Sequence, residues 1–290
     1  MDTFLQLTLS GLSNGMVYAL VAVGFVVIYK ASDVINFAQG EFLLFGAYLC
    51  FAFLAQFGLP WSIAVVATML GCAAIGLVVE RLVLRPLIGE PIISMIMATI
   101  GLSSVMKAVV NGIWGPRPRA FPSFFPEGSV EIGGATLGVD RILVIAIAAV
   151  LLVALQWFFK TTREGIAMRA IADDQQAALS MGISIRRVLA VAWALAAMTA
   201  AIAGMMLASM VGVGQEISYV GLRVFPVVIL GGLDSIPGAI VGGAIIGLLE
   251  AYTGGYIGHG LNLIVPFLVL ILVLMVRPYG LFGKEIIERV

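Results

Sequence analysis

Charge is scarce in this sequence, as are histidine and cysteine. Charged residues are 11% of 290, with zero net charge, one histidine and two cysteines. Globular chains carry about 25% charged residues, and a neutral chain is a poor partner for nucleic acid. One histidine excludes a histidine-based zinc cluster. Cys50 and Cys72 lie inside apolar runs, which favours two small packing residues over a disulfide or metal site.

Several chemical signatures are also absent. The chain has no Gly-x-x-x-x-Gly-Lys-Ser/Thr loop for nucleotide phosphates, no His-Glu-x-x-His and no Gly-x-Ser-x-Gly. Its spans hold too few charges for a relay of stacked carboxylates. We therefore expect no catalytic residue, metal or cofactor on this chain, and an ion-driven carrier is disfavoured without being excluded.

Hydrophobic residues, by contrast, make up 61% of the chain, which predicts an all-α, polytopic membrane protein. A span needs about 20 residues of helix. We expect about eight spans within one membrane domain over residues 1–290. They cover 7–29, the stretches that end near 57 and 79, and then 92–110, 142–159, 188–210, 239–251 and 261–276.

Small residues recur at helical spacing in two of these spans. Gly11 and Gly15 are four residues apart in the first, and the sixth repeats the pattern at Ala196, Ala200, Gly204 and Ala208. Small side chains at this spacing let two helices approach closely.

Residues 160–187, here called the connector, carry eight charges between two uncharged flanks. If the connector is cytoplasmic, eleven of the sixteen Lys and Arg residues lie on that side, as the positive-inside rule requires. This orientation places the N-terminus outside and the C-terminus in the cytoplasm. It also requires the stretch around 223–233 to cross the membrane or nearly do so.

The connector has the composition of a short amphipathic helix with small residues on one face. That face is Ile166, Ala167, Ala170, Ile171, Ala177, Ala178 and Met181. Asp174 interrupts it, and Gly182 is a natural helix stop. Such a face suits close approach by another protein; the alternative is a helix that lies on lipid.

Polar residues inside or beside the spans are candidates for a substrate pathway. They are Asn14, Tyr18, Asn36, Gln39 and Glu41. Buried polar groups in membranes are costly and often functional, although helix-packing contacts or interfacial caps are the alternative. Lys107 is close enough to a span end to extend its ammonium group into the interface.

A break in the hydrophobic pattern is predicted after residue 230. Its residues include Gly231, Gly232, Pro237 and Gly238. A short segment broken by Gly and Pro at membrane depth requires surrounding protein or a water-filled cavity, with a plain loop as the alternative. Elsewhere, Gly133-Gly134 weakly predicts a small hairpin over 132–139.

Several motifs together resemble the branched-chain amino acid ABC importer permeases, in particular the shorter permease type. The matching segments are Asn14-Gly15-x-x-Tyr18-Ala19-Leu20, Ile35–Phe42, Gly46-Ala47-Tyr48, Glu80-Arg81 with Arg85-Pro86-Leu87, Gly165-x-x-x-Arg169-Ala170-x-Ala172-Asp173-Asp174, Met181-Gly182-Ile183, Leu230–Ala239 and Arg277-Pro278-x-Gly280-Leu281-Phe282-Gly283. They cover nearly the whole chain in order. Gln39 stands where a histidine is common in that family, and Asp234 where a glycine is common.

The resemblance implies the permease subunit of an ATP-driven importer of small amino acids, chiefly Leu, Ile and Val, in a bacterial inner membrane. Its partners would be a second permease subunit or copy, two cytoplasmic ATPases that hold ATP and Mg²⁺, a periplasmic solute-binding protein and lipid. The connector would be its cytoplasmic coupling helix, and the expected ATPase contacts are Glu164, Gly165, Arg169, Ala170, Asp173, Asp174, Ala177, Ala178 and Gly182. The alternatives are a permease for urea or short amides, and a carrier that acts without an ATPase.

Overall fold

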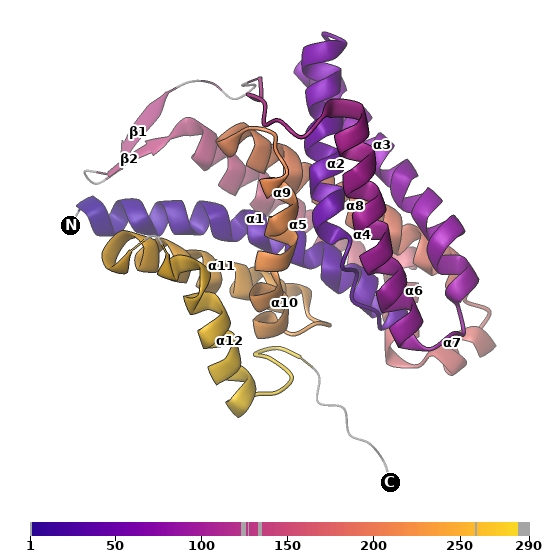
Figure 1. Cartoon of the computed structure of the whole chain (residues 1–290). Coiled ribbons are helices and arrows are strands. Elements are labelled where there is room, and N and C mark those ends of the chain that lie inside the picture. Colours follow the sequence, from indigo (N-terminus) through magenta and orange to yellow (C-terminus); the bar gives the residue numbers. More distant parts are fainter. Residues whose placement is uncertain (1, 123–125, 127, 133–134, 259, 284–290) are drawn as a thin grey trace. The chain divides into compact units, whose positions relative to one another are not determined.

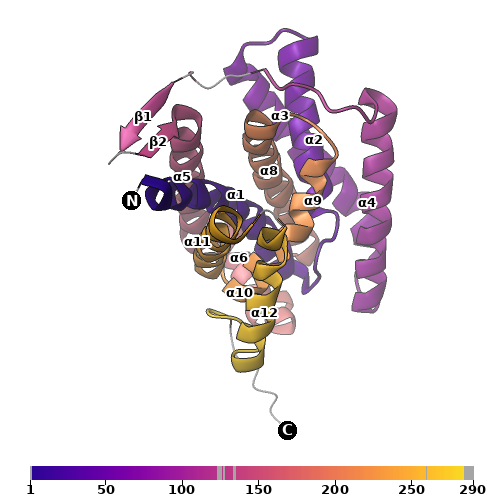
Figure 2. The same ribbon diagram turned by 60° about the vertical axis from the view of Figure 1, so that its left-hand side comes forward.

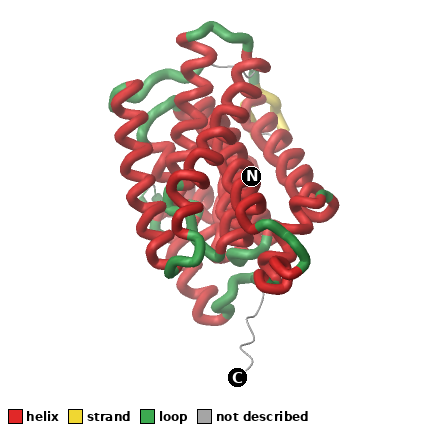
Figure 3. The backbone as a smooth tube through the Cα atoms, turned by 90° about the vertical axis from the view of Figure 1, so that its right-hand side faces the viewer, coloured by secondary structure: helices red, strands yellow, loops and turns green. Residues whose placement is uncertain are grey.

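The computed structural model is almost entirely helical (Figure 1). It describes residues 2–122, 126, 128–132, 135–258 and 260–283. In Figure 3 the helices are red and one short hairpin is yellow. Seven helices of the described chain are long and apolar enough to cross a membrane, and a shorter apolar stretch follows at Leu261–Val276. The expected all-α membrane fold of about eight spans is confirmed.

Each predicted span has a helical counterpart. The span-forming elements are α1 (Asp2–Ser32), α2 (Gln39–Phe51) with η1 (Ala52–Gln56), α3 (Trp61–Val79) with η2 (Glu80–Leu84) and η3 (Arg85–Leu87), α4 (Ile92–Trp114), α5 (Val139–Thr161), α8 (Ile185–Val211), α11 (Ile236–Tyr252) with η4 (Thr253–Ile257), and η5 (Leu261–Leu263) with α12 (Val265–Val276). Most helices extend a few residues past the predicted ends, because polar end turns continue the helix beyond the apolar run.

The remaining elements are short. They are β1 (Ser129–Ile132), β2 (Ala135–Gly138), α6 (Arg163–Asp173), α7 (Gln175–Ser180), α9 (Glu216–Arg223) and α10 (Phe225–Gly231). The two strands pair antiparallel, with Ile132 opposite Ala135. The predicted hairpin is therefore present, although it starts three residues earlier than expected, and its Gly133-Gly134 turn lies outside the described residues.

The contacts divide the chain into two compact units. Residues 1–26, 126–152 and 223–290 form the first unit, and residues 27–125 and 153–222 form the second. The helices α1 and α5 contribute to both. The expectation that residues 1–290 act as one domain stays a prediction.

In the second unit, α8 packs against both α2 and α3. Figure 2 shows these helices with α4 beside them. A Cβ atom built on Gly204 would lie 2.1 Å from the Leu43 carbonyl oxygen, and one on Gly46 would lie 2.3 Å from the Ala201 Cα atom. The backbones therefore meet directly, which confirms the small-residue seam predicted for the sixth span.

In the first unit, α1 crosses α11 in the same way. A Cβ atom on Gly243 would lie 2.5 Å from the Gly15 carbonyl oxygen, and one on Gly247 would lie 2.3 Å from that of Gly11. Two Gly-x-x-x-Gly pairs thus face each other across one crossing. The spacing in the first span correctly predicted close contact, although the sequence alone did not identify the partner helix.

The predicted break separates α10 from α11. Helix α10 ends at Gly231, Gly232 has φ +103°, and Ser235 Oγ accepts a hydrogen bond from the Gly238 amide at 3.1 Å to start α11. A Cβ atom on Gly238 would lie 2.0 Å from the Gly231 carbonyl oxygen. At eight and seven residues, α9 and α10 are each too short to span a membrane.

The closing motif near the C-terminus completes this break. The Leu281 amide donates to the Leu230 carbonyl oxygen at 2.8 Å, and the Phe282 amide donates to that of Gly231 at 3.1 Å. Carbonyl groups in the last turn of a helix have no partner within that helix. The segment that follows α12 therefore satisfies the exposed end of α10, a contact that sequence analysis did not foresee.

Candidate functional site

The five predicted pathway residues divide between the two units. Asn14 and Tyr18 lie on α1 in the first unit, one turn apart, whereas the other three lie at or just before the start of α2 in the second. Asn36, Gln39 and Glu41 are all buried. The structure therefore gives two separate groups of polar side chains, one within each unit.

Asn36 and Gln39 belong to a hydrogen-bonded network that shapes the entry into α2. The Asn36 side chain accepts from the Ala38 amide at 3.0 Å and donates to Gln39 Oε1 at 3.2 Å. Gln39 Nε2 in turn donates to the Ala196 carbonyl oxygen on α8 at 3.3 Å. Both side chains thus have internal partners, which favours a packing role in this conformation.

Glu41 differs from these two because it carries a charge. It lies in the first turn of α2 with only 2% of its surface exposed, and its Oε1 is 3.1 Å from Lys107 Nζ on α4. Its Oε2 has no hydrogen-bond partner within the described chain. A buried carboxylate with one unpaired oxygen is costly. Among the predicted pathway residues, Glu41 therefore has an oxygen that can accept a further hydrogen bond.

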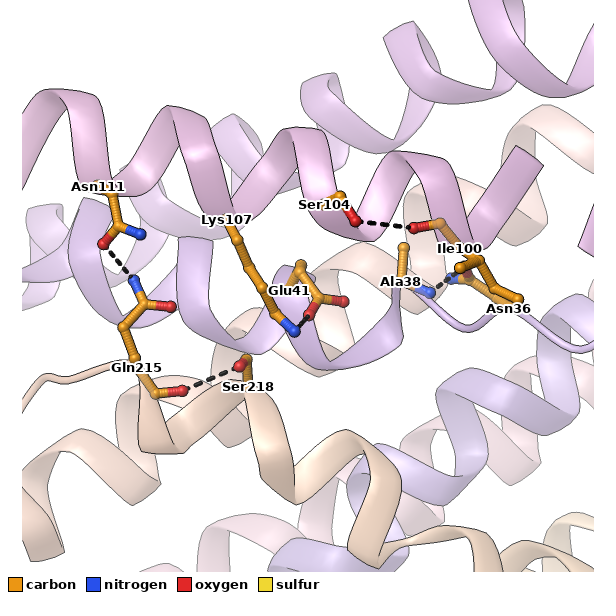
Figure 4. Close-up of polar contacts among 9 residues, drawn as sticks. All are labelled: Asn36, Ala38, Glu41, Ile100, Ser104, Lys107, Asn111, Gln215 and Ser218. Carbon is orange, nitrogen blue, oxygen red and sulfur yellow. Dashed lines mark hydrogen bonds and ion pairs between the residues drawn. The ribbon is translucent and has the colours of Figure 1, made fainter. Parts of the chain in front are cut away.

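Lys107 was expected to extend toward the membrane surface, and the structure corrects this. Figure 4 shows its side chain pointing from α4 to Glu41 on α2. Its ammonium group also lies 5.6 Å from the centre of the Tyr219 ring. An opposite charge in a low-dielectric interior stabilises a cation more than the interface can, so the lysine turns inward.

Asn111 lies one helical turn beyond Lys107 on α4. Its Oδ1 accepts a hydrogen bond from Gln215 Nε2 at 2.7 Å, and the Gln215 carbonyl oxygen accepts from Ser218 Oγ at 2.9 Å (Figure 4). These contacts join α4 to the start of α9. Sequence analysis missed Asn111 and Gln215, although an amide four residues from an intramembrane lysine was an available signal.

The backbone around Glu41 is held by close contact with α9. A Cβ atom on Gly40 would lie 2.1 Å from the Ser218 carbonyl oxygen, and one on Gly221 would lie 2.5 Å from the Gly40 Cα atom. Neither glycine can be enlarged without moving a backbone. The position of the ion pair is thus set by glycines in two helices.

The first unit holds a second carboxylate that sequence analysis missed. Tyr18 Oη donates a hydrogen bond to Glu250 Oε2 on α11 at 2.7 Å, and the Arg223 guanidinium lies close enough to interact with both groups. Glu250 is the one charged residue within α11, which was the available signal. The predicted pathway residue Tyr18 therefore has a carboxylate as its hydrogen-bond partner and a cation nearby.

The connector forms two helices where one was predicted. Thr162 Oγ1 accepts from the Gly165 amide to begin α6, and Asp174 Oδ1 accepts from the Ala177 amide at 2.9 Å to begin α7. Asp174 itself is extended, with φ −157° and ψ 106°, because a capping residue leaves the helical conformation. The predicted stop at Gly182, with φ +81°, is confirmed.

Burial also revises which face of the connector is open. Gly165, Met168, Ile171 and Ala178 are buried within the second unit, so the expected ATPase contacts Gly165 and Ala178 face inward. Glu164 pairs with Arg187. Three large apolar side chains of the connector are exposed to solvent in the isolated chain: Ile166, Leu179 and Met181. Met181 is 83% exposed. The expected ATPase contacts all stay predictions.

The described side chains of this arrangement offer groups that can bind a solute. No cluster of three or more His, Cys, Asp or Glu residues that could hold a metal occurs among the described residues. Both cysteines are buried and free. What the second unit provides is a buried ion pair with spare hydrogen-bonding capacity, which suits transient binding of a polar solute.

Comparisons with known proteins match this chain to permeases of branched-chain amino acid transport systems. A family model described as the permease component of branched-chain amino acid transport systems matches residues 7–274. The high-affinity branched-chain amino acid transport system permease protein LivH of Salmonella typhimurium is 34% identical over 99% of this chain and 98% of its own length. The corresponding protein BraD of Pseudomonas aeruginosa is 31% identical over the same shares. LivM of Escherichia coli is 27% identical over 76% of this chain and 57% of LivM.

Proposed function

This chain belongs to the family of branched-chain amino acid transport permease components, and we propose that it is the permease subunit of an ATP-driven importer for leucine, isoleucine and valine. The observation that carries the proposal is the match of 31–34% identity over 99% of the chain to LivH and BraD. As a transport subunit of this family, the chain is a membrane protein and has no enzymatic role of its own.

The interior of the chain supports passage of a small charged solute. Amino acids at neutral pH carry an ammonium and a carboxylate group, and both are costly to bring into an apolar interior without partners. Tyr18, Glu41, Lys107 and Glu250 place charged or polar groups inside helices of mainly apolar composition. Asn14, Asn36 and Gln39 remain proposed pathway residues beside them.

We further propose that the connector receives work from a cytoplasmic ATPase, with ATP and Mg²⁺ held on that partner chain. The side chains of Ile166, Leu179 and Met181 are exposed, and a partner that binds the connector can cover them. LivM is also similar to this chain, which favours a second, related permease subunit as a partner. A periplasmic binding protein would deliver the amino acid.

A cavity within the second unit lies between the connector and the loop that precedes α2. It has a volume of about 250 Å³ and is lined by Ile171 and Gln175 of the connector together with Asp33, Ile88 and Leu189. Asp33 lies three residues before Asn36. Movement of the connector could therefore change the loop that carries Asn36, and coupling requires such an element with two positions.

The proposed orientation follows from the distribution of Lys and Arg. The connector and the C-terminus would lie in the cytoplasm and the N-terminus outside, in a bacterial inner membrane. A single cysteine placed at the exposed position Ser180 should react with a membrane-impermeant thiol reagent in inverted vesicles and not in intact cells. Labelling in intact cells would reverse the orientation and contradict ATPase docking.

Transport by the assembled complex tests the function directly. The complex is purified through a tag on this chain and reconstituted into liposomes with its binding protein outside and its ATPases accessible to ATP. We expect uptake of radiolabelled leucine that requires hydrolysable ATP and that unlabelled isoleucine and valine inhibit. A non-hydrolysable ATP analogue is the control.

The alternatives predict different results in the same assay. Inhibition by urea or acetamide, with no effect of isoleucine, would replace the proposed substrate with a small amide. Leucine uptake that persists without ATP or ATPase subunits would indicate a carrier that acts alone.

A further inference from the structure

In the second unit, α2 and α4 meet along a seam of paired side chains. Glu41 pairs with Lys107 at 3.1 Å. Seven residues further along each helix, the rings of Tyr48 and Trp114 lie 5.3 Å apart. Seven residues of helix are two turns, or about 10 Å. The two helices therefore run in the same direction. The aromatic pair lies two helical turns beyond the charged pair.

The seam also concentrates polar atoms that lack partners. Five buried side-chain atoms of the described chain have no hydrogen-bond partner, and three of them are Glu41 Oε2, Tyr48 Oη and Trp114 Nε1. Buried polar groups are nearly always satisfied in folded proteins. Three exceptions along one helix pair mark this seam as a place where a solute can supply the missing contacts.

A second ion pair in the same unit shows what a purely structural pair looks like. Glu80 is 1% exposed, and Arg85 donates to both of its carboxylate oxygens, at 3.1 and 2.8 Å. Both oxygens are therefore satisfied within the chain. Glu41 is buried to the same degree, yet Lys107 approaches only one of its oxygens, so Glu41 retains a free acceptor for an additional cation.

We propose that the Glu41–Lys107 pair is the subsite that binds the charged head group of the transported amino acid. The α-ammonium group binds the Glu41 carboxylate, including Oε2, and the α-carboxylate binds the Lys107 ammonium. Binding converts one ion pair into two, so no charge is left unpaired in a low-dielectric interior. This inference rests on the proposed function and adds the residues that recognise its substrate class.

The geometry allows this exchange because Lys107 is not locked in place. Its side chain is 36% exposed, whereas that of Glu41 is 3% exposed. The lysine can thus move aside on its flexible side chain. The backbone next to Glu41 stays in place, because Gly40 is in close contact with α9. A neutral solute such as urea offers no charge to either partner, so the same subsite would discriminate against it.

The test removes both charges together. Glu41→Gln with Lys107→Met leaves no unpaired buried charge, and replacement of a buried pair by neutral groups is often tolerated. In the reconstituted complex with saturating leucine-loaded binding protein, we expect ATP hydrolysis within about twofold of wild type and at least a tenfold loss of leucine transported per ATP. The matched control, Glu80→Gln with Arg85→Met, should keep both quantities near wild type.

The outcomes separate this inference from the proposed function. Wild-type complex that transports no leucine overturns the function itself. Wild-type complex that transports leucine, with a Glu41/Lys107 double variant that transports it equally well, overturns the subsite alone. If that double variant does not assemble, Lys107→Arg decides: a severalfold lower ratio of leucine to ATP with normal assembly supports the subsite, and an unchanged ratio overturns it.

Discussion

The two units share one packing principle and differ in the partner that each gives to a carboxylate within a helix. In the first unit, Gly15 and Gly243 let α1 and α11 touch, and Glu250 accepts a hydrogen bond from Tyr18 at 2.7 Å. In the second unit, Gly40 and Gly204 let α2 meet α9 and α8, and Glu41 pairs with Lys107. Glycine crossings therefore provide rigid positions in both units, while the polar partners differ.

This difference assigns different duties to the units. Glu250 has a hydroxyl donor and a nearby cation, Arg223, whereas Glu41 keeps one carboxylate oxygen without a partner and pairs with a lysine that another charge can replace. The connector also belongs to the second unit. We therefore expect variants of the second unit to affect transport most, and variants of the first unit to affect stability most.

The largest expected effect comes from closing the glycine crossings. Gly204→Ala in the second unit and Gly243→Ala in the first place a methyl group 2.1 Å and 2.5 Å from a carbonyl oxygen. Backbones must move apart, and overpacking of this kind typically costs about 1–3 kcal/mol. Purified yield and the thermal unfolding temperature in detergent should fall sharply for both.

Two glycines of α4 provide the matched control. Cβ atoms built on Gly101 and Gly112 meet nothing within 4 Å. Alanine at these positions should raise helix stability by up to about 1 kcal/mol, because glycine is the poorer helix former. A tolerated Gly204→Ala beside an intolerant Gly243→Ala would show that the second unit is the more loosely packed of the two.

The next effect concerns the acid of the first unit. Tyr18→Phe removes the hydroxyl that donates to the partly buried Glu250, and because a fully buried acceptor left without its donor costs about 1–3 kcal/mol, we expect a cost at the low end of that range. The unfolding temperature should fall. Because Tyr18 is also a proposed pathway residue, leucine transported per ATP should fall in the folded fraction, by less than in the Glu41/Lys107 double variant. A loss of stability with unchanged transport would restrict Tyr18 to a structural role.

Thr8→Val is the control for the loss of a hydroxyl from α1. Thr8 Oγ1 lies 2.8 Å from Tyr252 Oη in a less buried position. Water can replace this contact, so the fall in unfolding temperature should be smaller than for Tyr18→Phe. Equal effects would mean that the deeper burial of Tyr18 adds nothing to the cost.

The sequence predicted the course of the chain well and the polar contacts poorly. Span order, the Gly231–Gly238 break and the stop at Gly182 follow from local composition and spacing, which act over a few residues. The partners of Glu41 and Tyr18 are Lys107 and Glu250, which are distant in sequence. Such contacts depend on which helices become neighbours, and periodicity carries no such information.

The connector shows the same limit on a smaller scale. Asp174 was identified as an interruption of the apolar face, but a helix cap and an interrupted face have the same composition. Only the extended backbone at Asp174 and its bond to the Ala177 amide separate the two interpretations. The predicted docking face therefore includes both buried and exposed residues. Ala178 is buried and Met181 is exposed, and this difference depends on the bend between α6 and α7.

A third prediction tests whether work enters through the second unit. Asp174→Ser keeps a capping oxygen and should be nearly neutral, whereas Asp174→Ala should cost about 1 kcal/mol of local helix stability. Asp174→Arg loses the cap and reverses the charge, so the ATPase should copurify with this chain in lower amount and ATP-dependent uptake should fall. Normal ATPase copurification and uptake in Asp174→Arg would contradict docking at this bend.

The smallest expected effect is pH-dependent and concerns Asp33, which lines the cavity beside the connector. Its φ is +54°, and partial burial raises the pKa of its carboxyl group above the ordinary aspartate value. The folded state therefore holds this proton to a higher pH than the unfolded state, so the contribution of Asp33 to stability declines as pH rises from about 4. Asn cannot ionise and also tolerates positive φ.

Asp33→Asn should thus match wild type at low pH and exceed it at neutral pH by about 0.5 kcal/mol or less, the usual range for a surface position. Unfolding temperatures measured between pH 4 and pH 8 give the comparison. Asp33→Gly is the control, because it also relieves the left-handed backbone conformation and its gain should persist at low pH. A pH-independent difference between Asp33→Asn and wild type would show that the backbone, and not burial of the charge, limits stability at this end of the second unit.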